Sequence, residues 1–292
     1  MRLHHLIDSS ISEQLSDIKS HEDVKYEDPV IFHCYWNKEV GTNQLFSILS
    51  CYLTNVKGTN NKIILWHDFD IKKCIDSDIY RLLRRFCEVK NFDHFAERIG
   101  TPLESYQIDR NGYLSMPSFY SDYLRLIMLY RYGGMWFDLD ILFFKRFDYL
   151  FSKYDSFMYT WERSKHPNNA LFWCRDKGIL KSMIERFIEY GGGHFGIQDT
   201  FGNRRENQIH FGLDSTLEIN VLPCGWFDSM WICDPCDFEL WFKDNGDGYF
   251  YDDAYCYHWH SRNNLPIEKG SPFHRNIVRV VEGLGLQDVI RT

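Results

Sequence analysis

Long hydrophobic runs are missing from this 292-residue sequence. No segment approaches the roughly 20 apolar residues that a membrane span requires, and the N-terminal stretch MRLHHLIDSSISEQL lacks the apolar region of a signal peptide. We therefore expect no membrane span. Peripheral contact with a membrane, and the earlier removal of an N-terminal anchor, stay open.

Features of secreted and of nucleic-acid-binding proteins are missing as well. No Asn-x-Ser/Thr sequon occurs, and the nine cysteines are odd in number and irregularly spaced, unlike the paired framework of a small secreted domain. The net charge of −8 excludes a chain that binds nucleic acid through its overall charge. We expect a cytoplasmic protein in a reducing environment, with no nucleic-acid partner.

Two nucleotide-binding fingerprints are absent too. No Gly-x-Gly-x-x-Gly follows the first predicted strand, and no Walker-type loop occurs. The composition that is present, 44% hydrophobic and 25% charged, is that of a globular protein with a sizeable core. Aromatic residues make up 17% of the chain, so flat surfaces for stacking are available.

Strand and helix patterns alternate over the first hundred residues. Segments 29–36, 62–66 and 88–93 have the pattern of strands, and 42–55 and 77–88 have that of helices. This alternation predicts a parallel sheet with crossover helices, whose ligands bind at the carboxyl ends of the strands.

The sequence patterns in the later part of the chain predict further helices and strands of the same domain. We expect a helix at 178–193, a loop at 194–215, a strand at 218–223, and a turn followed by an aromatic-rich strand within 244–262. The expected organisation is a single domain over 29–262. A surface segment at 1–28 precedes it, and a helical tail at 263–292 packs on it.

The segment SDYLRLIMLYRYGGMWFDLDILFF, residues 121–144, carries two carboxylates in an otherwise apolar predicted strand, 135–144. Residues two apart in a strand point to one face, so Asp138 and Asp140 project together. Neighbouring carboxylates repel each other, and a divalent metal with hard oxygen ligands, Mn²⁺ or Mg²⁺, resolves the repulsion. The alternative is that the strand ends at Phe137 and both acids lie in a solvated turn.

As a whole, this segment resembles the core motif of the Asp-x-Asp glycosyltransferases with the GT-A fold. In these families a Ser-Asp-x-x-Arg helix leads into Tyr-Gly-Gly, a short hydrophobic strand and Asp-x-Asp. They include capsular polysaccharide transferases, α-1,4-galactosyl- and N-acetylglucosaminyltransferases and the yeast initiating α-mannosyltransferase, and clostridial glucosylating toxins have a similar core. The matching positions are Ser121, Asp122, Arg125, Tyr132, Gly133, Gly134, Asp138 and Asp140.

The resemblance extends over residues 29–262, through PVIFHCYW, KIILWHD, HPNNALFWCRDKGILKSMIERFIE, VLPCGWF and YHWHSR. It implies an α/β fold of the GT-A type, a Rossmann-like mixed sheet flanked by helices. Regions 94–117 and 194–215 have no counterpart in the family pattern, and such regions usually determine donor and acceptor selectivity.

The resemblance also implies roles for the charged residues. Asp140 would bind the metal directly, and Asp138 would contact the ribose or a metal-bound water. Asp122 would accept hydrogen bonds from sugar hydroxyls, and Arg125 would bind the sugar or the diphosphate. For Asp122 and Arg125, which lie one helical turn apart, the alternative is a surface ion pair of little energetic value.

Three further positions are candidates. Trp36 ends the first predicted strand, where the resemblance implies stacking on the nucleobase, and core packing is the alternative. His258 and His260 alternate on a predicted strand, and the resemblance favours His258 as a metal ligand, with His260 as the second choice. For either histidine, a core hydrogen bond without a metal is the alternative.

The sequence therefore predicts a metal-dependent enzyme that moves a sugar from a nucleotide diphosphate sugar to a glycan hydroxyl. A UDP-sugar is the favoured donor, and the resemblance implies retention of anomeric configuration. The alternatives are a toxin-like protein glycosyltransferase, a nucleotide-sugar- or carbohydrate-binding protein without turnover, and a metal-dependent phosphohydrolase.

Overall fold

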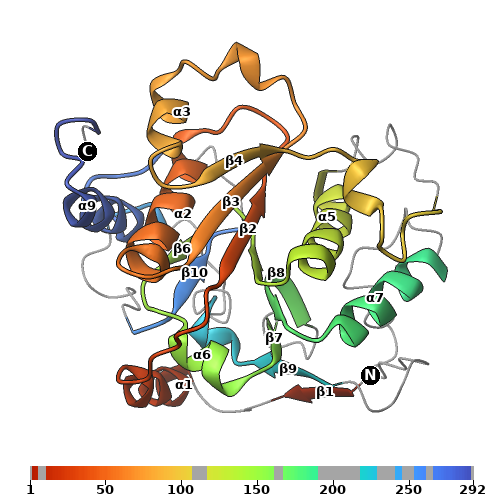
Figure 1. Cartoon of the computed structure of the whole chain (residues 1–292). Coiled ribbons are helices and arrows are strands. Elements are labelled where there is room, and N and C mark those ends of the chain that lie inside the picture. The colour runs from red at the N-terminus through yellow and green to blue at the C-terminus, as the bar shows by residue number, and fades with distance from the viewer. Residues whose placement is uncertain are drawn as a thin grey trace.

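A mixed eight-stranded sheet forms the centre of the computed structural model (Figure 1). In spatial order its strands are β1 Arg2–His5, β9 Glu218–Leu222, β7 Ser156–Thr160, β8 Pro167–Cys174, β5 Met135–Phe137, β2 Ile31–Tyr35, β3 Lys62–His67 and β4 Glu88–Asn91. A second, two-stranded sheet pairs β6 Ile141–Phe143 with β10 Cys256–His258. The structure describes residues 2–5, 11–106, 117–160, 167–189, 218–228, 241–244, 253–260 and 266–290.

Strand direction changes across the large sheet. Strands β5, β2, β3 and β4 run parallel to one another, whereas β8 runs antiparallel to both β5 and β7. Strand β9 pairs in parallel with β7, and β1 in parallel with β9. The predicted parallel arrangement is confirmed for β2 to β4, and the sheet as a whole is mixed, as the predicted fold class requires.

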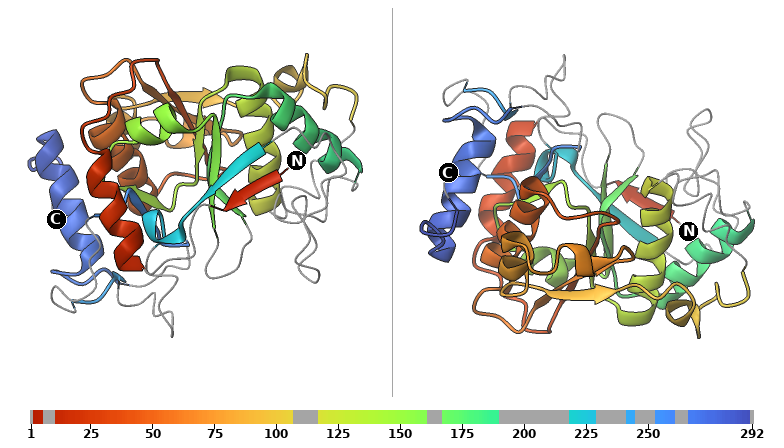
Figure 2. Two further views of the ribbon diagram at one scale, coloured as in Figure 1. Left: turned by 90° about the horizontal axis from the view of Figure 1, so that it is seen from below. Right: turned by 90° about the horizontal axis from the view of Figure 1, so that it is seen from above.

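Helices cover both faces of the sheet (Figure 2). The α-helices are α1 Ile11–Ile18, α2 Thr42–Cys51, α3 Asp78–Leu83, α5 Pro117–Tyr132, α6 Asp148–Lys153, α7 Lys177–Glu189 and α9 Pro272–Leu284. A π-helical segment, Tyr52–Val56, extends α2, and 3-10 turns lie at Lys19–His21, Ile71–Lys73, Ala96–Arg98 and Cys224–Trp226. Within the described ranges, none of the helices has the length and apolarity needed to cross a membrane.

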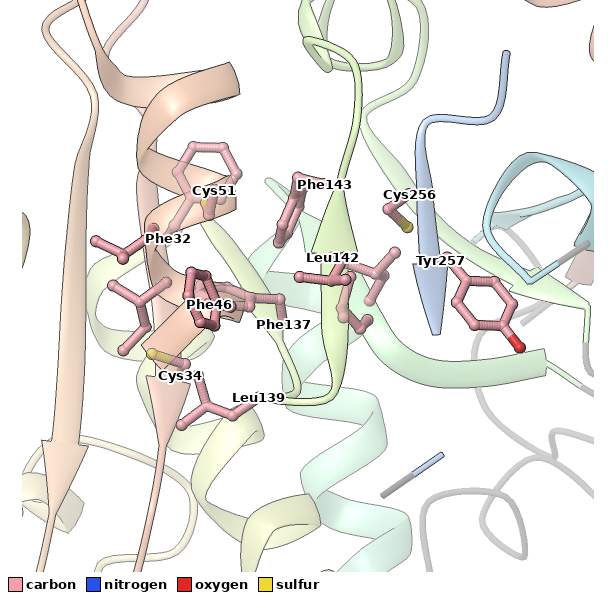
Figure 3. Close-up of a cluster of buried hydrophobic side chains, with 14 of the residues drawn as sticks. Phe32, Cys34, Phe46, Cys51, Phe137, Leu139, Leu142, Phe143, Cys256 and Tyr257 are labelled. Carbon is pink, nitrogen blue, oxygen red and sulfur yellow. The ribbon is translucent and has the colours of Figure 1, made fainter. Parts of the chain in front are cut away.

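Two hydrophobic clusters pack between the sheet and the helices. Successive residues of β3 belong to different clusters, Ile63 to the first and Ile64 to the second, because strand side chains alternate between faces. The first cluster joins β2 and α2 to β6 and β10, and part of it is visible in Figure 3. There the ring of Phe32 lies edge-on to Phe143, with 6.4 Å between ring centres. The second cluster packs under α5 and α7.

The single strand predicted over 135–144 is wrong. Strand β5 ends at Phe137, residues 138–140 form a turn, and β6 begins at Ile141. The chain changes sheets here, because β5 pairs with β2 and β8 whereas β6 pairs with β10. Asp138 and Asp140 therefore lie in the turn between two sheets and do not share one strand face.

Other element boundaries are shorter than predicted. Helix α3 ends at Leu83, and the described residues of the segment 244–262, namely 244 and 253–260, contain the three-residue strand β10 of the aromatic strand expected there. The glycines that end the predicted helix 178–193, and the predicted loop 194–215, lie outside the described residues. The predicted domain boundaries stay predictions; β1 pairs with the large sheet and α9 buries Phe273 and Val280 in the first cluster.

The second glycine of the Tyr-Gly-Gly turn, Gly134, occupies a position that only glycine fits. Gly134 has a φ of +89°, and a Cβ built there would lie 2.2 Å from the Ile31 carbonyl oxygen. We expect Gly134→Ala to lower the free energy of unfolding by about 2–4 kcal/mol, since both a positive φ and a backbone clash oppose it. Urea unfolding followed by circular dichroism measures this change.

Gly133 provides the matched control for that substitution. Its φ is also positive, +65°, but a Cβ there would meet nothing within 4 Å. Gly133→Ala should therefore cost only about 1–2 kcal/mol, from the backbone conformation alone. Equal losses for the two variants would mean that the close approach to Ile31 has no energetic consequence.

His33 on β2 is fully buried and neutral. Its Nδ1 accepts a hydrogen bond from Trp66 Nε1 at 3.0 Å, so Nε2 carries the proton and donates to the Gly133 carbonyl oxygen at 3.0 Å. Burial, opposed by the Gly133 hydrogen bond, lowers the pKa of His33 from 6.5 to about 4. Protonation of Nδ1 would break the bond from Trp66.

Because its pKa is lower in the folded state, His33 contributes stability that is complete above about pH 6.5 and is lost as the pH falls toward 4. The expected loss is about 3 kcal/mol over this interval. Measured from pH 7 to 4, the unfolding free energy should fall less steeply for His33→Gln than for the unchanged protein. Parallel curves for the two proteins would contradict the assignment.

Candidate active site

The carboxyl ends of the parallel strands β2, β3 and β5 meet at one edge of the sheet. Trp36 follows β2 at this edge, and its backbone N–H donates to the Trp66 carbonyl oxygen at 3.0 Å. Asp138 follows β5, the neighbour of β2 on the other side. Trp36 is half-buried, packs against the first cluster and donates from Nε1 to the Glu39 carbonyl oxygen at 3.2 Å. Its predicted role in base stacking stays a prediction.

Arg125 is the most deeply buried charge at this edge. Its side chain is 2% exposed, and its Nη2 lies 3.0 Å from Asp138 Oδ1 and 3.3 Å from Asp122 Oδ1. Its guanidinium lies over the Trp136 ring, 5.3 Å from the ring centre, and it also donates to the Asn169 carbonyl oxygen. Asp122 and Arg125 face the same side, as predicted, and the alternative of a surface ion pair is wrong because the pair is buried.

The two acids of the Asp-x-Asp motif, Asp138 and Asp140, differ in their surroundings. Asp138 accepts from Trp136 Nε1 at 2.7 Å and, 30% exposed, is the more open of the two. Burial raises the pKa of Asp138, Arg125 opposes that shift, and the nearby charge of Asp140 adds to it. The solvated turn considered as an alternative is therefore half right: the acids do lie in a turn, but the turn is largely buried.

His258 completes this arrangement from β10. Its Nε2 lies 3.2 Å from Asp140 Oδ1, and its Nδ1 lies 2.7 Å from the Tyr159 hydroxyl. Burial opposes a charge on His258, but Asp140, Asp228 and Asp138 together raise its pKa to about 8. The structure thus places Asp140 against His258, with Asp138 near enough for its charge to act on both, and the predicted metal site of these three residues stays a prediction.

His260 lies close to His258 for a reason other than the one predicted. Strand β10 ends at His258, so the two residues do not alternate on a strand. His260 instead has a positive φ of +58°, and its ring lies against that of His258, tilted by 31° with 3.8 Å between centres. Its Nε2 lies 2.6 Å from Asp228 Oδ2.

Asp138, Asp140 and His258 are of ligand types that suit a divalent cation, since Mn²⁺ accepts carboxylates and imidazole readily. A cation would also favour the charged form of Asp138, whose pKa is raised by burial and, in addition, by the nearby charge of Asp140. The contact between His258 Nδ1 and Tyr159 would orient the imidazole, as partners of metal-bound histidines generally do.

Three residues of the site were not predicted from the sequence. Asn169 donates from Nδ2 to Asp122 Oδ1 at 3.1 Å, Tyr159 contacts His258, and Asp228 contacts His260. Asn169 belongs to the HPNN sequence and Asp228 follows VLPCGWF, both of which carried the family resemblance. Nothing in the sequence marks Tyr159, because its contact with His258 joins strands almost a hundred residues apart.

Solved structures with a similar fold are known. The glycosyltransferase GlyE of Streptococcus pneumoniae TIGR4 is similar with a TM-score of 0.50 and 11% identity, over 88% of this chain and 63% of GlyE. The apo structure of the bifunctional glycosyltransferase WbbM is similar with a TM-score of 0.50 and 11% identity, over 91% of this chain and 52% of WbbM. The chain thus spans less than two thirds of either protein, and the likeness confirms the predicted GT-A fold.

Comparison with protein families gives a match over part of the chain. A family model described as capsular polysaccharide synthesis protein matches residues 89–190, which include α5, the Tyr-Gly-Gly turn and the acid pair. No curated protein matches the chain. The family match and the fold together confirm the predicted resemblance to glycosyltransferases with the GT-A fold.

Proposed function

We propose that this protein transfers a sugar from a nucleotide diphosphate sugar, favouring a UDP-sugar, to a hydroxyl of a growing glycan, with a divalent metal and with retention of anomeric configuration. The observation that carries the proposal is the convergence of Asp138, Asp140, His258 and the buried Arg125 at the carboxyl edge of the sheet. A polysaccharide acceptor is in keeping with the description of the family that residues 89–190 match.

In this proposal Asp140 and His258 hold the cation, with Asp138 beside them. When bound, the ion supplies Lewis-acid stabilisation of the charge that develops on the departing diphosphate. Arg125, which is buried, holds the carboxylates of Asp122 and Asp138 in place, so that both are oriented before the donor binds. Asp122 then accepts hydrogen bonds from sugar hydroxyls, and Trp36 at the same edge stacks on the base.

We also propose that the protein works in the cytoplasm, where nucleotide sugars are a natural donor pool. The seven described cysteines, Cys34, Cys51, Cys74, Cys87, Cys174, Cys224 and Cys256, are all free thiols, which is in keeping with a reducing compartment. Localisation of a tagged chain in the native cell tests this part of the proposal.

The test is donor turnover by the purified protein. A panel of nucleotide sugars is incubated with Mn²⁺, and free nucleoside diphosphate and free sugar are followed, with and without a chelator. Slow hydrolysis of one donor that stops with the chelator supports the proposal and identifies the sugar. Tight, metal-independent binding without turnover would indicate a binding protein, and release of inorganic phosphate in place of sugar would indicate a phosphohydrolase.

A further inference from the structure

A second group of metal-ligating side chains lies next to the acid pair. Asp228, His258 and His260 each offer one ligand atom, and these atoms all lie within 4.8 Å of one another. Atoms bound to one ion by bonds of about 2.1 Å lie from about 3.0 Å apart, at right angles, to about 4.2 Å, when opposite. The three side chains therefore need only small shifts to hold a single cation.

Asp228 supplies a separate sign that a ligand belongs here. Its side chain is fully buried, and Oδ2 is 2.6 Å from His260 Nε2. Its other oxygen, Oδ1, is buried and has no hydrogen-bond partner in the described part of the chain. A buried carboxylate oxygen is normally satisfied, and a cation would satisfy this one.

The backbone at His260 is also held in an uncommon conformation. A φ of +58° is unfavourable for a residue with a Cβ, and here it turns the imidazole back toward Asp228 and His258. In this conformation His260 Nε2 lies 2.6 Å from Asp228 Oδ2.

The ligand chemistry of this group differs from that of the acid pair. Two imidazoles and one carboxylate suit a borderline ion such as Zn²⁺, whereas the carboxylates of Asp138 and Asp140 suit harder ions. His258 belongs to both groups. Since its Nδ1 contacts Tyr159, its Nε2 is the atom left for a metal, and one nitrogen lone pair binds one ion at a time.

We propose that Asp228, His258 and His260 form a second cation site, selective for Zn²⁺ over Mg²⁺. This site shares His258 with the Asp138–Asp140 site, so the two sites cannot both be fully occupied at the same time. The site itself is independent of the proposed function. Its consequence rests on that function: Zn²⁺ bound here withdraws His258 from the donor-binding metal and inhibits Mn²⁺-supported turnover.

Zn²⁺ and Mn²⁺ binding to two variants tests the site without any assay of activity. Equilibrium dialysis with metal analysis should show that Asp228→Asn weakens Zn²⁺ binding by at least about 10–100-fold while Mn²⁺ is retained. Asp140→Asn should show the reverse pattern. Visible absorption of bound Co²⁺, as a substitute for Zn²⁺, gives an independent readout of imidazole ligation.

Several outcomes would overturn the proposal. Loss of both ions in both variants would mean one shared site, and unchanged Zn²⁺ binding in Asp228→Asn would mean no second site. His260→Gln provides a second variant if Asp228→Asn fails to fold, which circular dichroism reveals. Cys233→Ser must retain Zn²⁺, because the Cys-x-x-Cys of Cys233 and Cys236, outside the described residues, is the rival ligand pair in the sequence.

Turnover measurements then separate the two proposals. If a donor is turned over with Mn²⁺, added Zn²⁺ should inhibit the unchanged protein at concentrations at least about 10-fold lower than those that inhibit Asp228→Asn. If no donor is turned over and the dialysis pattern still appears, the proposed function fails and the second cation site stands. Equal inhibition of both proteins would overturn the regulatory consequence.

Discussion

Asp140→Asn is expected to lower donor turnover by about 10³-fold or more, since removing a metal-binding carboxylate forfeits several kcal/mol of stabilisation of the developing charge. Asparagine keeps the size of the side chain and an oxygen that can accept a hydrogen bond, so the turn between β5 and β6 should persist. The measurement is the initial rate of nucleoside diphosphate release at saturating Mn²⁺, together with the apparent Mn²⁺ affinity.

Asp148 offers a control that matches Asp140 in burial. Its side chain is 7% exposed against 12% for Asp140, and it also has one basic partner, Arg146, at 2.7 Å. It lies at the start of α6 and belongs to a different surface of the protein. Asp148→Asn should change thermal stability without changing turnover. If Asp140→Asn retained wild-type turnover, the acid pair would not hold the catalytic metal.

Much of the fold could be predicted from local pattern. The strands β2, β3 and β4 are short apolar or alternating runs separated by helical segments, and the sequence positions of all three were predicted correctly to within a few residues. The break at 138–140 could not be predicted this way, because the apolar residues on both sides of it are buried, with Phe144 partly so, just as they would be in a continuous strand. Pairing with β10, more than a hundred residues later, decides where the strand ends.

The candidate site also combines residues that local sequence predicts with residues that only distant contacts reveal. The residues that lie close together in sequence, from Asp122 to Asp140, were predicted to act together, and the structure places Arg125 in contact with Asp122 and Asp138, whereas Asp140 contacts His258. The histidines were predicted as candidates but for a wrong structural reason, since a positive φ and not strand alternation brings His260 to His258. Asp228 and Tyr159 were missed because only the three-dimensional fold brings them, from distant parts of the sequence, against the imidazoles of His260 and His258.

Arg125→Ala is expected to have the largest effect on stability. The substitution removes the guanidinium that contacts both Asp122 and Asp138, and leaves the charge of Asp138 close to that of Asp140. Breaking a buried ion pair from one side costs about 3–5 kcal/mol, because the remaining charge stays buried without a partner. The loss should shrink toward pH 4, as protonation neutralises Asp138, whose pKa burial already raises. Urea unfolding at pH 7 and at pH 4 measures both effects.

Arg81→Ala on α3 is the control, because Arg81 pairs with Asp78 and both side chains are largely exposed, 67% and 91%. It should cost no more than about 1 kcal/mol, as exposed ion pairs generally do. The double variant Arg125→Ala, Asp138→Asn sharpens the test, since removing the unpaired charge should restore part of the lost stability without restoring turnover. If the double variant were as unstable as Arg125→Ala alone, packing of Arg125 on Trp136, and not its charge, would be what stabilises this edge of the sheet.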